Sequence, residues 1–177
     1  MFTFLLAELP NLELNMPPPL SHEELAEYVE MALIPPRYQV ALAQGGDALS
    51  AGEPGKRASR IFREYQDFEV FLRQTIARKR AKEQGKEVAF DRSPEYRHDI
   101  VLAVDSAAAI ADPLERERAI DKLRWQAIEE ISAGHELDFD ALCAYKLKLD
   151  ILIRRRHRDR EVGLASFNST LDGKVSR

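Results

Sequence analysis

Residues 139–158 read FDALCAYKLKLDILIRRRHR, and the apolar residues of this stretch cover more than one side of a helix. Four of them recur at spacings of three and four, as on one face of an amphipathic helix: Leu142, Tyr145, Leu149 and Leu152. Leu147 and Ile151 lie off that stripe. A helix that is apolar on several sides belongs between other helices. The stretch therefore predicts a helical bundle with this segment inside it.

Further helices are predicted on the N-terminal side of this stretch and after it. Ser21 and Glu24 form a capping box, and Asp112–Pro113 combines a cap with a proline in the first turn. Ser93–Pro94 repeats the cap-and-proline signal. Apolar periodicity and these caps predict helices at about 22–33, 37–43, 58–83, 94–110, 113–134, 139–158 and 160–171. Residues 2–6 are the one candidate for a strand, so we expect an all-α bundle of six or seven helices.

A glycine-rich stretch, GGDALSAGEPGK at residues 45–56, interrupts the helical pattern. Four glycines and a proline in so short a space predict a flexible loop. The spacing of a phosphate-binding loop is absent, and no apolar strand precedes the stretch. We expect residues 1–177 to form a single helical domain that carries this loop.

The overall composition narrows the class of protein. Of the 177 residues, 32% are charged and 45% hydrophobic, which is ordinary for a soluble, helix-rich chain. A net charge of −4 gives no general attraction to nucleic acid or to anionic membranes. The single cysteine, Cys143, excludes an internal disulfide and fits a reducing compartment, or one whose redox state does not matter to the protein. We expect a cytoplasmic protein that meets a membrane only indirectly.

The apolar leader MFTFLLA raises the question of export. It has no basic segment before its short apolar run, and Glu8 and Glu13 place charges soon after that run. The run is also far below the roughly 20 residues that a membrane helix needs. We expect the leader to bury its apolar side chains against the protein itself, with docking on a partner as the alternative.

Candidate catalytic residues are sparse. His98–Asp99 resembles the doublet of all-α metal phosphohydrolases, but no other histidine lies at a suitable spacing, so a surface position is the simpler interpretation. Cys143 lies inside an apolar helix with no histidine nearby, as a buried, inert thiol would. The sequence thus predicts no enzyme, no cofactor and no metal site.

Candidate partner-binding residues are more numerous. Five arginines crowd the end of the 139–158 segment: Arg154, Arg155, Arg156, Arg158 and Arg160. Cations complement a helix C-terminus, but this run is denser than capping requires, so an acidic protein surface or nucleic acid are alternatives. No aromatic residues interleave with the arginines, which makes nucleic acid the weaker of the two. Trp125 fits the core, or an interface anchor.

Two stretches together resemble a known family. The first is FTFLLAELPNLEL (2–14) with PPPLSHEEL (17–25), and the second is LRWQAIEEISAGHELDFDALCAYKLKLDILIRR (123–155). They resemble a small bacterial family whose genes lie among those of V/A-type (vacuolar-like) ATPases. The positions in the last helix that carry the resemblance are Phe139, Asp140, Ala144, Tyr145, Leu147, Lys148, Leu149, Ile151 and Leu152.

The resemblance implies a role without catalysis. Members of that family are thought to be similar to the C subunit (d in eukaryotic naming), an all-α funnel that joins the central stalk to the membrane rotor ring. It implies a helical subunit or accessory protein that couples or assembles the two, with ATPase subunits as partners. It covers about the first 45 and the last 60 residues, and the middle matches only in helical character. The alternative is a helical binding module acting through the arginine-rich end.

Overall fold

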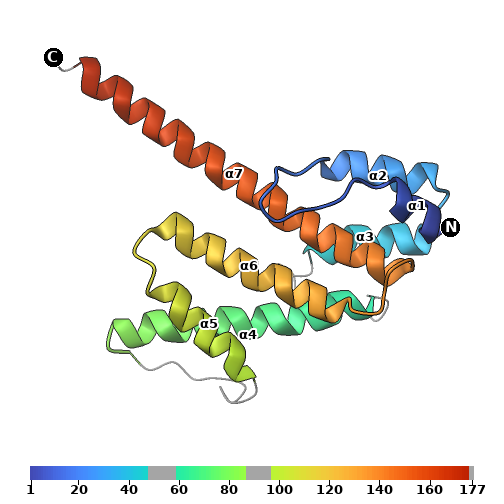
Figure 1. Ribbon diagram of the computed structural model, residues 1–177, viewed down its shortest axis with the longest axis horizontal. Coiled ribbons are helices and arrows are strands. Elements are labelled where there is room, and N and C mark those ends of the chain that lie inside the picture. Colours follow the sequence, from blue (N-terminus) through green and yellow to red (C-terminus); the bar gives the residue numbers. More distant parts are fainter. Residues whose placement is uncertain (48–58, 87–96, 176–177) are drawn as a thin grey trace.

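The computed structural model describes residues 1–47, 59–86 and 97–175 of the chain (Figure 1). These residues form seven helices and no strand, so the predicted all-α bundle is confirmed for the part described. In chain order the helices are α1 (Phe2–Glu8), α2 (His22–Met31), α3 (Pro36–Asp47), α4 (Arg60–Glu83), α5 (His98–Ala108), α6 (Pro113–Ile131) and α7 (Phe139–Val175).

Helix α7 lies at the centre of the arrangement, as its apolar pattern predicts. It packs against α1, α3, α4 and α6, while α4, α5 and α6 pack against one another. Figure 1 shows α7 passing between the N-terminal helices and the α4–α6 group and extending beyond both. Its buried side chains include residues on and off the main stripe: Leu142, Leu147, Leu149, Ile151 and Leu152. Burial on several sides is the reason that this segment organises the fold.

The structure corrects the expected division of the last segment. Two helices, 139–158 and 160–171, were predicted, but α7 is one continuous helix from Phe139 to Val175. The arginines near residue 158 are good helix formers, and each of the two internal glycines, Gly163 and Gly173, weakens a helix by only about 1 kcal/mol. No proline interrupts the ladder there, so nothing ends the helix.

The strand candidate at residues 2–6 is also wrong, because these residues belong to helix α1. Leu5 is buried, and Phe2 and Leu6 pack against the core from the same helix face. Phe4 points away and is 77% exposed. Seven residues cannot hold a helix alone in water. Helix α1 therefore depends on the burial of its apolar face.

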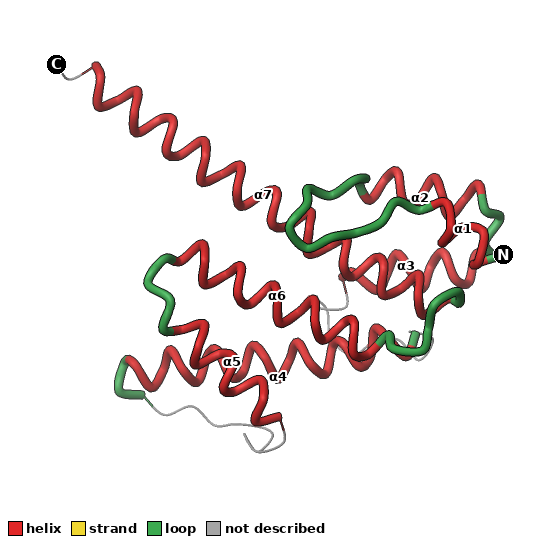
Figure 2. The backbone as a smooth tube through the Cα atoms, viewed as in Figure 1, coloured by secondary structure: helices red, strands yellow, loops and turns green. Residues whose placement is uncertain are grey.

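Contacts with α7 fix the extended segment between α1 and α2, which Figure 2 shows as a long loop. The hydroxyl of Tyr145 donates a hydrogen bond of 2.9 Å to the carbonyl oxygen of Pro10. The guanidinium of Arg155 donates to the carbonyl oxygen of Leu14. Side chains of α7 thus satisfy backbone groups that no regular structure pairs. The leader is folded onto the body, as expected, except that the side chain of Phe4 stays exposed.

Helix ends agree with the cap signals where the structure describes them. Ser21 and Glu24 form the full capping box, and Asp112 accepts a hydrogen bond from the amide of Leu114. Gly85, at φ +70°, follows α4 in a left-handed turn. Helix α3 runs to Asp47, so the first three residues of the expected loop 45–56 are helical. The rest of that loop and the Ser93–Pro94 cap lie outside the described residues.

Helix α2 ends in a way that the sequence did not suggest. The helix ends at Met31, before Pro35 and Pro36, and the chain turns at Leu33, which has a φ of +52°. The amide of Leu33 donates to the carbonyl of Glu30, and the amide of Ile34 to that of Val29. A helix end with these two hydrogen bonds usually has glycine at the turn, because a side chain in the left-handed region costs roughly 1–2 kcal/mol. Leucine is thus strained at this turn.

Candidate functional site

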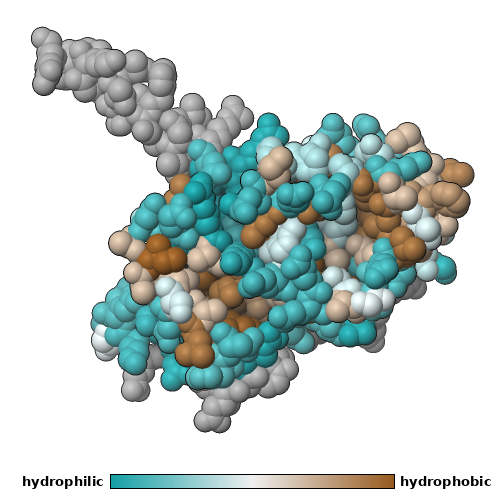
Figure 3. Space-filling model, viewed as in Figure 1, coloured by the Kyte–Doolittle hydropathy of each residue, from teal (hydrophilic) through white to brown (hydrophobic). Residues whose placement is uncertain are grey.

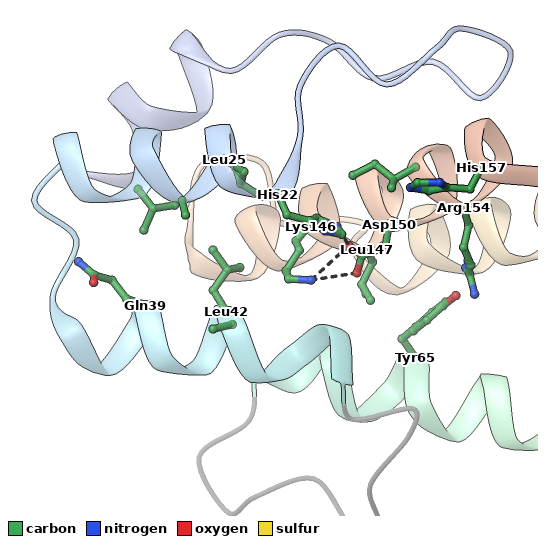
Figure 4. A pocket seen from close by; sticks show the side chains of 14 residues that line it. His22, Leu25, Gln39, Leu42, Tyr65, Lys146, Leu147, Asp150, Arg154 and His157 are labelled. Atoms are coloured by element: carbon green, nitrogen blue, oxygen red, sulfur yellow. Dashed lines mark hydrogen bonds and ion pairs between the residues drawn. The ribbon is translucent and has the colours of Figure 1, made fainter. Parts of the chain in front are cut away.

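A cavity of about 680 Å³ lies between α2, α3 and α7, with Tyr65 of α4 closing one side (Figure 4). Its apolar walls come from three helices and include Leu25, Val29, Leu42, Leu147 and Ile153. Its polar lining includes His22, Gln39, Lys146, Asp150, Arg154 and His157. Concave sites with apolar walls and a few polar groups are where small ligands usually bind. This cavity is the candidate functional site.

Asp150 is the centre of a small ionic cluster on the cavity wall. Its Oδ1 lies 2.6 Å from Nε2 of His22. The ammonium group of Lys146, one turn earlier on α7, lies 3.0 Å from Oδ2. Figure 4 shows the bonds to Asp150 within the cavity. The cluster joins α2 to α7 and neutralises the carboxylate of Asp150.

Arg154 and Tyr65 form the other polar end of the cavity. Figure 4 shows the Tyr65 hydroxyl pointing toward the Arg154 side chain. Burial raises the pKa of Tyr65 above its ordinary value, so the phenol stays neutral and can donate. The Nε of Arg154 is buried and has no hydrogen-bond partner among the described residues. This end of the cavity therefore presents donors.

The polar residues of the cavity follow a pattern in the sequence that the predictions from periodicity and caps missed. Lys146, Asp150, Arg154 and His157 recur at spacings of three and four on α7. Such spacing puts polar side chains on one helix face. A polar stripe on a helix that is otherwise buried indicates a lined cavity. The contributions of α2 and Tyr65 needed the tertiary structure.

The five arginines predicted as a partner surface do not act as one group. Arg155 bonds the carbonyl of Leu14, and Arg158 bonds Glu117 at 3.2 Å and also Asp121. Arg154 lines the cavity, and Arg156 is exposed. The side chain of Arg160 lies outside the described part of the chain. Helical geometry spreads adjacent residues around the axis, so a run in sequence becomes several separate environments.

Trp125, the other predicted contact residue, is buried, which favours the core interpretation. Its indole N–H donates a hydrogen bond of 2.9 Å to Glu129. The ammonium group of Lys148 lies 4.9 Å from the ring centroid, so α7 covers the aromatic face with a cation. The residue joins α6 to α7.

The residues considered for catalysis lie apart from the cavity. Both oxygens of Asp99 are bonded by Arg97, which holds the pKa of Asp99 below its ordinary value. Burial raises the pKa of the Cys143 thiol to about 12, where it is a poor nucleophile. Within the described ranges, no three His, Cys, Asp or Glu side chains are grouped closely enough to hold a metal ion.

A second surface feature lies at the end formed by α1, α2 and α3, where Figure 3 shows hydrophobic residues gathered. Four large apolar side chains of these helices and of the turn after α2 are exposed, and we call them together the apolar end: Phe4, Met31, Leu33 and Val40, at 77%, 70%, 83% and 54%. Contiguous exposed apolar surface marks interaction sites in soluble proteins. Among the described helices, none is both long and apolar enough to span a bilayer.

Comparison with known proteins relates part of the chain to a family. Residues 101–173 match the sequence model of a family described as "Protein of unknown function (DUF2764)". The matched segment covers most of α5, all of α6 and nearly all of α7, which is less than half of the chain. No curated protein and no solved structure matches the chain.

Proposed function

We propose that this chain is a non-enzymatic helical subunit or accessory protein of a V/A-type ATPase, which binds other subunits through its apolar end. The proposal joins the sequence resemblance of residues 2–25 and 123–155 to one structural observation, the exposed Leu33. The protein would meet the membrane only through the complex, on its cytoplasmic side.

Leu33 carries the argument. A leucine at φ +52° that is also 83% exposed is unfavourable twice, in its backbone and in its contact with water. Asparagine or glycine would suit the turn better. Strain of this kind is found where a residue serves another purpose, and a large apolar side chain at the surface serves protein contacts. Phe4 extends the same apolar end from α1.

The test is co-purification from the native host. The full chain, carrying an affinity tag, is recovered from gently solubilised membranes, and the bound proteins are identified by mass spectrometry. We expect central-stalk or rotor subunits of a V/A-type ATPase. Recovery of the chain alone, under conditions that keep the ATPase assembled, contradicts the proposal.

A matched pair of variants assigns the contact surface. Phe4→Ser with Leu33→Asn removes two apolar side chains, and asparagine tolerates the left-handed turn. We expect this variant to fold as the wild type does and to lose the ATPase subunits. Leu102→Ser removes an exposed apolar residue of α5 instead and should retain them. Equal retention by both variants would exclude the apolar end as the contact.

A further inference from the structure

The cavity between α2, α3 and α7 has the dimensions of a ligand site. Its volume of about 680 Å³ lies within the range of roughly 300–1,000 Å³ of small-molecule sites. Leucine, valine and isoleucine side chains from three helices form its walls. Such walls favour an apolar chain, because its burial releases water from both surfaces.

The polar lining of the cavity carries more positive than negative charge. Asp150 is the one carboxylate among the lining residues described, and His22 and Lys146 both bond it. Arg154 has no carboxylate within ion-pair distance among the described residues, and His157 lies beside it on the same helix. Among the described residues Arg154 is thus in no ion pair, and its guanidinium faces the hydroxyl of Tyr65 instead.

The geometry of Arg154 also leaves a donor without a partner. Its buried Nε makes no hydrogen bond to the described residues, and a buried donor left unpaired is unfavourable. A guanidinium offers its donors as a fork that matches a carboxylate or a phosphate. The Tyr65 hydroxyl points toward the same place and can donate as well.

We propose that this cavity binds an amphiphilic anion, with a carboxylate or phosphate head at Arg154 and Tyr65 and an acyl chain along the apolar walls. The ligand would touch α2, α3 and α7 together, so its binding would strengthen the attachment of the N-terminal helices to α7. This site is separate from the apolar end. Its test needs no ATPase subunit.

The test is calorimetric titration of the purified chain with three probes of equal tail length, namely decanoate, decyl phosphate and uncharged decanol, each below its aggregation concentration. We expect one decanoate or decyl phosphate per chain, bound more tightly than decanol by roughly tenfold to a hundredfold, as a charge-assisted hydrogen bond implies. Comparison of the two anions separates a fatty-acid head from a phosphate head. Equal binding of all three probes, or no binding, overturns the proposal.

Three variants locate the site. Arg154→Gln should reduce anion affinity to the level of decanol and leave decanol binding unchanged. Arg156→Gln removes an exposed arginine of the same helix and should bind as the wild type does. Ala26→Phe places a ring at the cavity wall from an exposed position, so the fold should persist while all three probes lose affinity. Unchanged anion binding by Arg154→Gln, or by Ala26→Phe, excludes this cavity.

Discussion

Arg124 of α6 holds the fully buried carboxylate of Glu69 on α4 by two hydrogen bonds of 3.0 Å each. Arg73 bonds the same carboxylate at 2.9 Å. Arg124 also reaches Asp121, which Arg158 of α7 bonds from the other side. Burial acts to raise the pKa of Glu69, but Arg124 and then Arg73 outweigh it, so the pKa lies below the ordinary value. One ionic network thus links α4, α6 and α7.

Removal of Arg124 should be strongly destabilising. Arg124→Met leaves the Glu69 charge buried with Arg73 as its remaining cation among the described residues. Loss of one partner from a buried pair costs about 3 kcal/mol. Urea denaturation followed by circular dichroism measures the free energy of unfolding. Replacement of both partners, Glu69→Met with Arg124→Met, should be less harmful than the single change, since it removes the buried charge too. A double variant as unstable as the sum of both single variants would contradict this.

The exposed pair Arg60–Glu64 supplies the control for that experiment. Unlike Arg124–Glu69 it lies within one helix, as an i,i+4 pair of α4 at 2.6 Å, and its side chains are 58% and 41% exposed. Exposed pairs contribute little. Arg60→Met should therefore unfold at the same urea concentration as the wild type, within error. A loss similar to that of Arg124→Met would mean that burial is not what makes the Glu69 network important.

The ionised Glu69 carboxylate should make the free energy of unfolding depend on pH. Its pKa is lowered from the ordinary value of 4.5 in the folded state, so its contribution to stability is present above about pH 4.5 and is lost as the pH falls through the folded value. Glu69→Gln should be less stable than the wild type at neutral pH. The difference should narrow as the solution becomes more acidic.

Denaturation at a series of pH values measures this narrowing. Glu27→Gln, which removes an exposed carboxylate of α2, is the control for the change in net charge. If the difference in free energy of unfolding between Glu69→Gln and the wild type stayed constant across the acidic range, the lowered pKa of Glu69 would be contradicted.

Adjacent residues of α1 should respond differently to truncation. Leu5 is 1% exposed and Phe4 is 77% exposed. Leu5→Ala removes a core side chain and should cost about 2 kcal/mol or more, whereas Phe4→Ala should stay within about 0.5 kcal/mol of the wild type. Hydrogen exchange of the amides of residues 2–9 should accelerate only in Leu5→Ala. If these residues formed a strand with alternating faces, Phe4 would be buried with Phe2. Phe4→Ala would then cost more stability than Leu5→Ala.

Cys143 should be protected from alkylation until the protein unfolds. It is completely buried, and burial raises the pKa of its thiol to about 12, so almost no thiolate exists near neutral pH. Its reaction with iodoacetamide, followed by mass spectrometry, should accelerate only as urea unfolds the chain. Val40→Cys in a Cys143→Ala background places the thiol on an exposed part of α3 and should react at once. Rapid labelling of native Cys143 would contradict the buried position.

Periodicity and caps predicted five of the described helices, α2 to α6, to within about four residues at each end, and predicted where α7 begins. The signals were local: the capping box at Ser21, the Asp112–Pro113 start and the glycine after α4 each act within one turn. The helix at residues 2–6 was missed, because five consecutive apolar or small residues fit the period of a helix as well as that of a strand. The break expected near residue 159 was wrong, because a charged stretch without proline continues a helix as readily as it ends one.

Most of the candidate site could not be predicted from signals between neighbouring residues. The stripe Lys146, Asp150, Arg154 and His157 is present in the sequence, but His22 and Tyr65 come from 124 and 81 positions before Lys146 in the chain. Likewise the arginine run looked like one surface, and helical rotation divided it between the cavity, the leader and the α6 carboxylates.

The amino-acid order alone determined that this chain is helical and that residues 139–158 lie inside the bundle, because periodicity and capping depend on neighbours within one or two turns. Only the tertiary structure decided which polar groups meet, such as Arg124 with Glu69 and Arg154 with Tyr65. Those meetings depend on how helices cross, and crossing is set by the packing of side chains that are far apart in sequence.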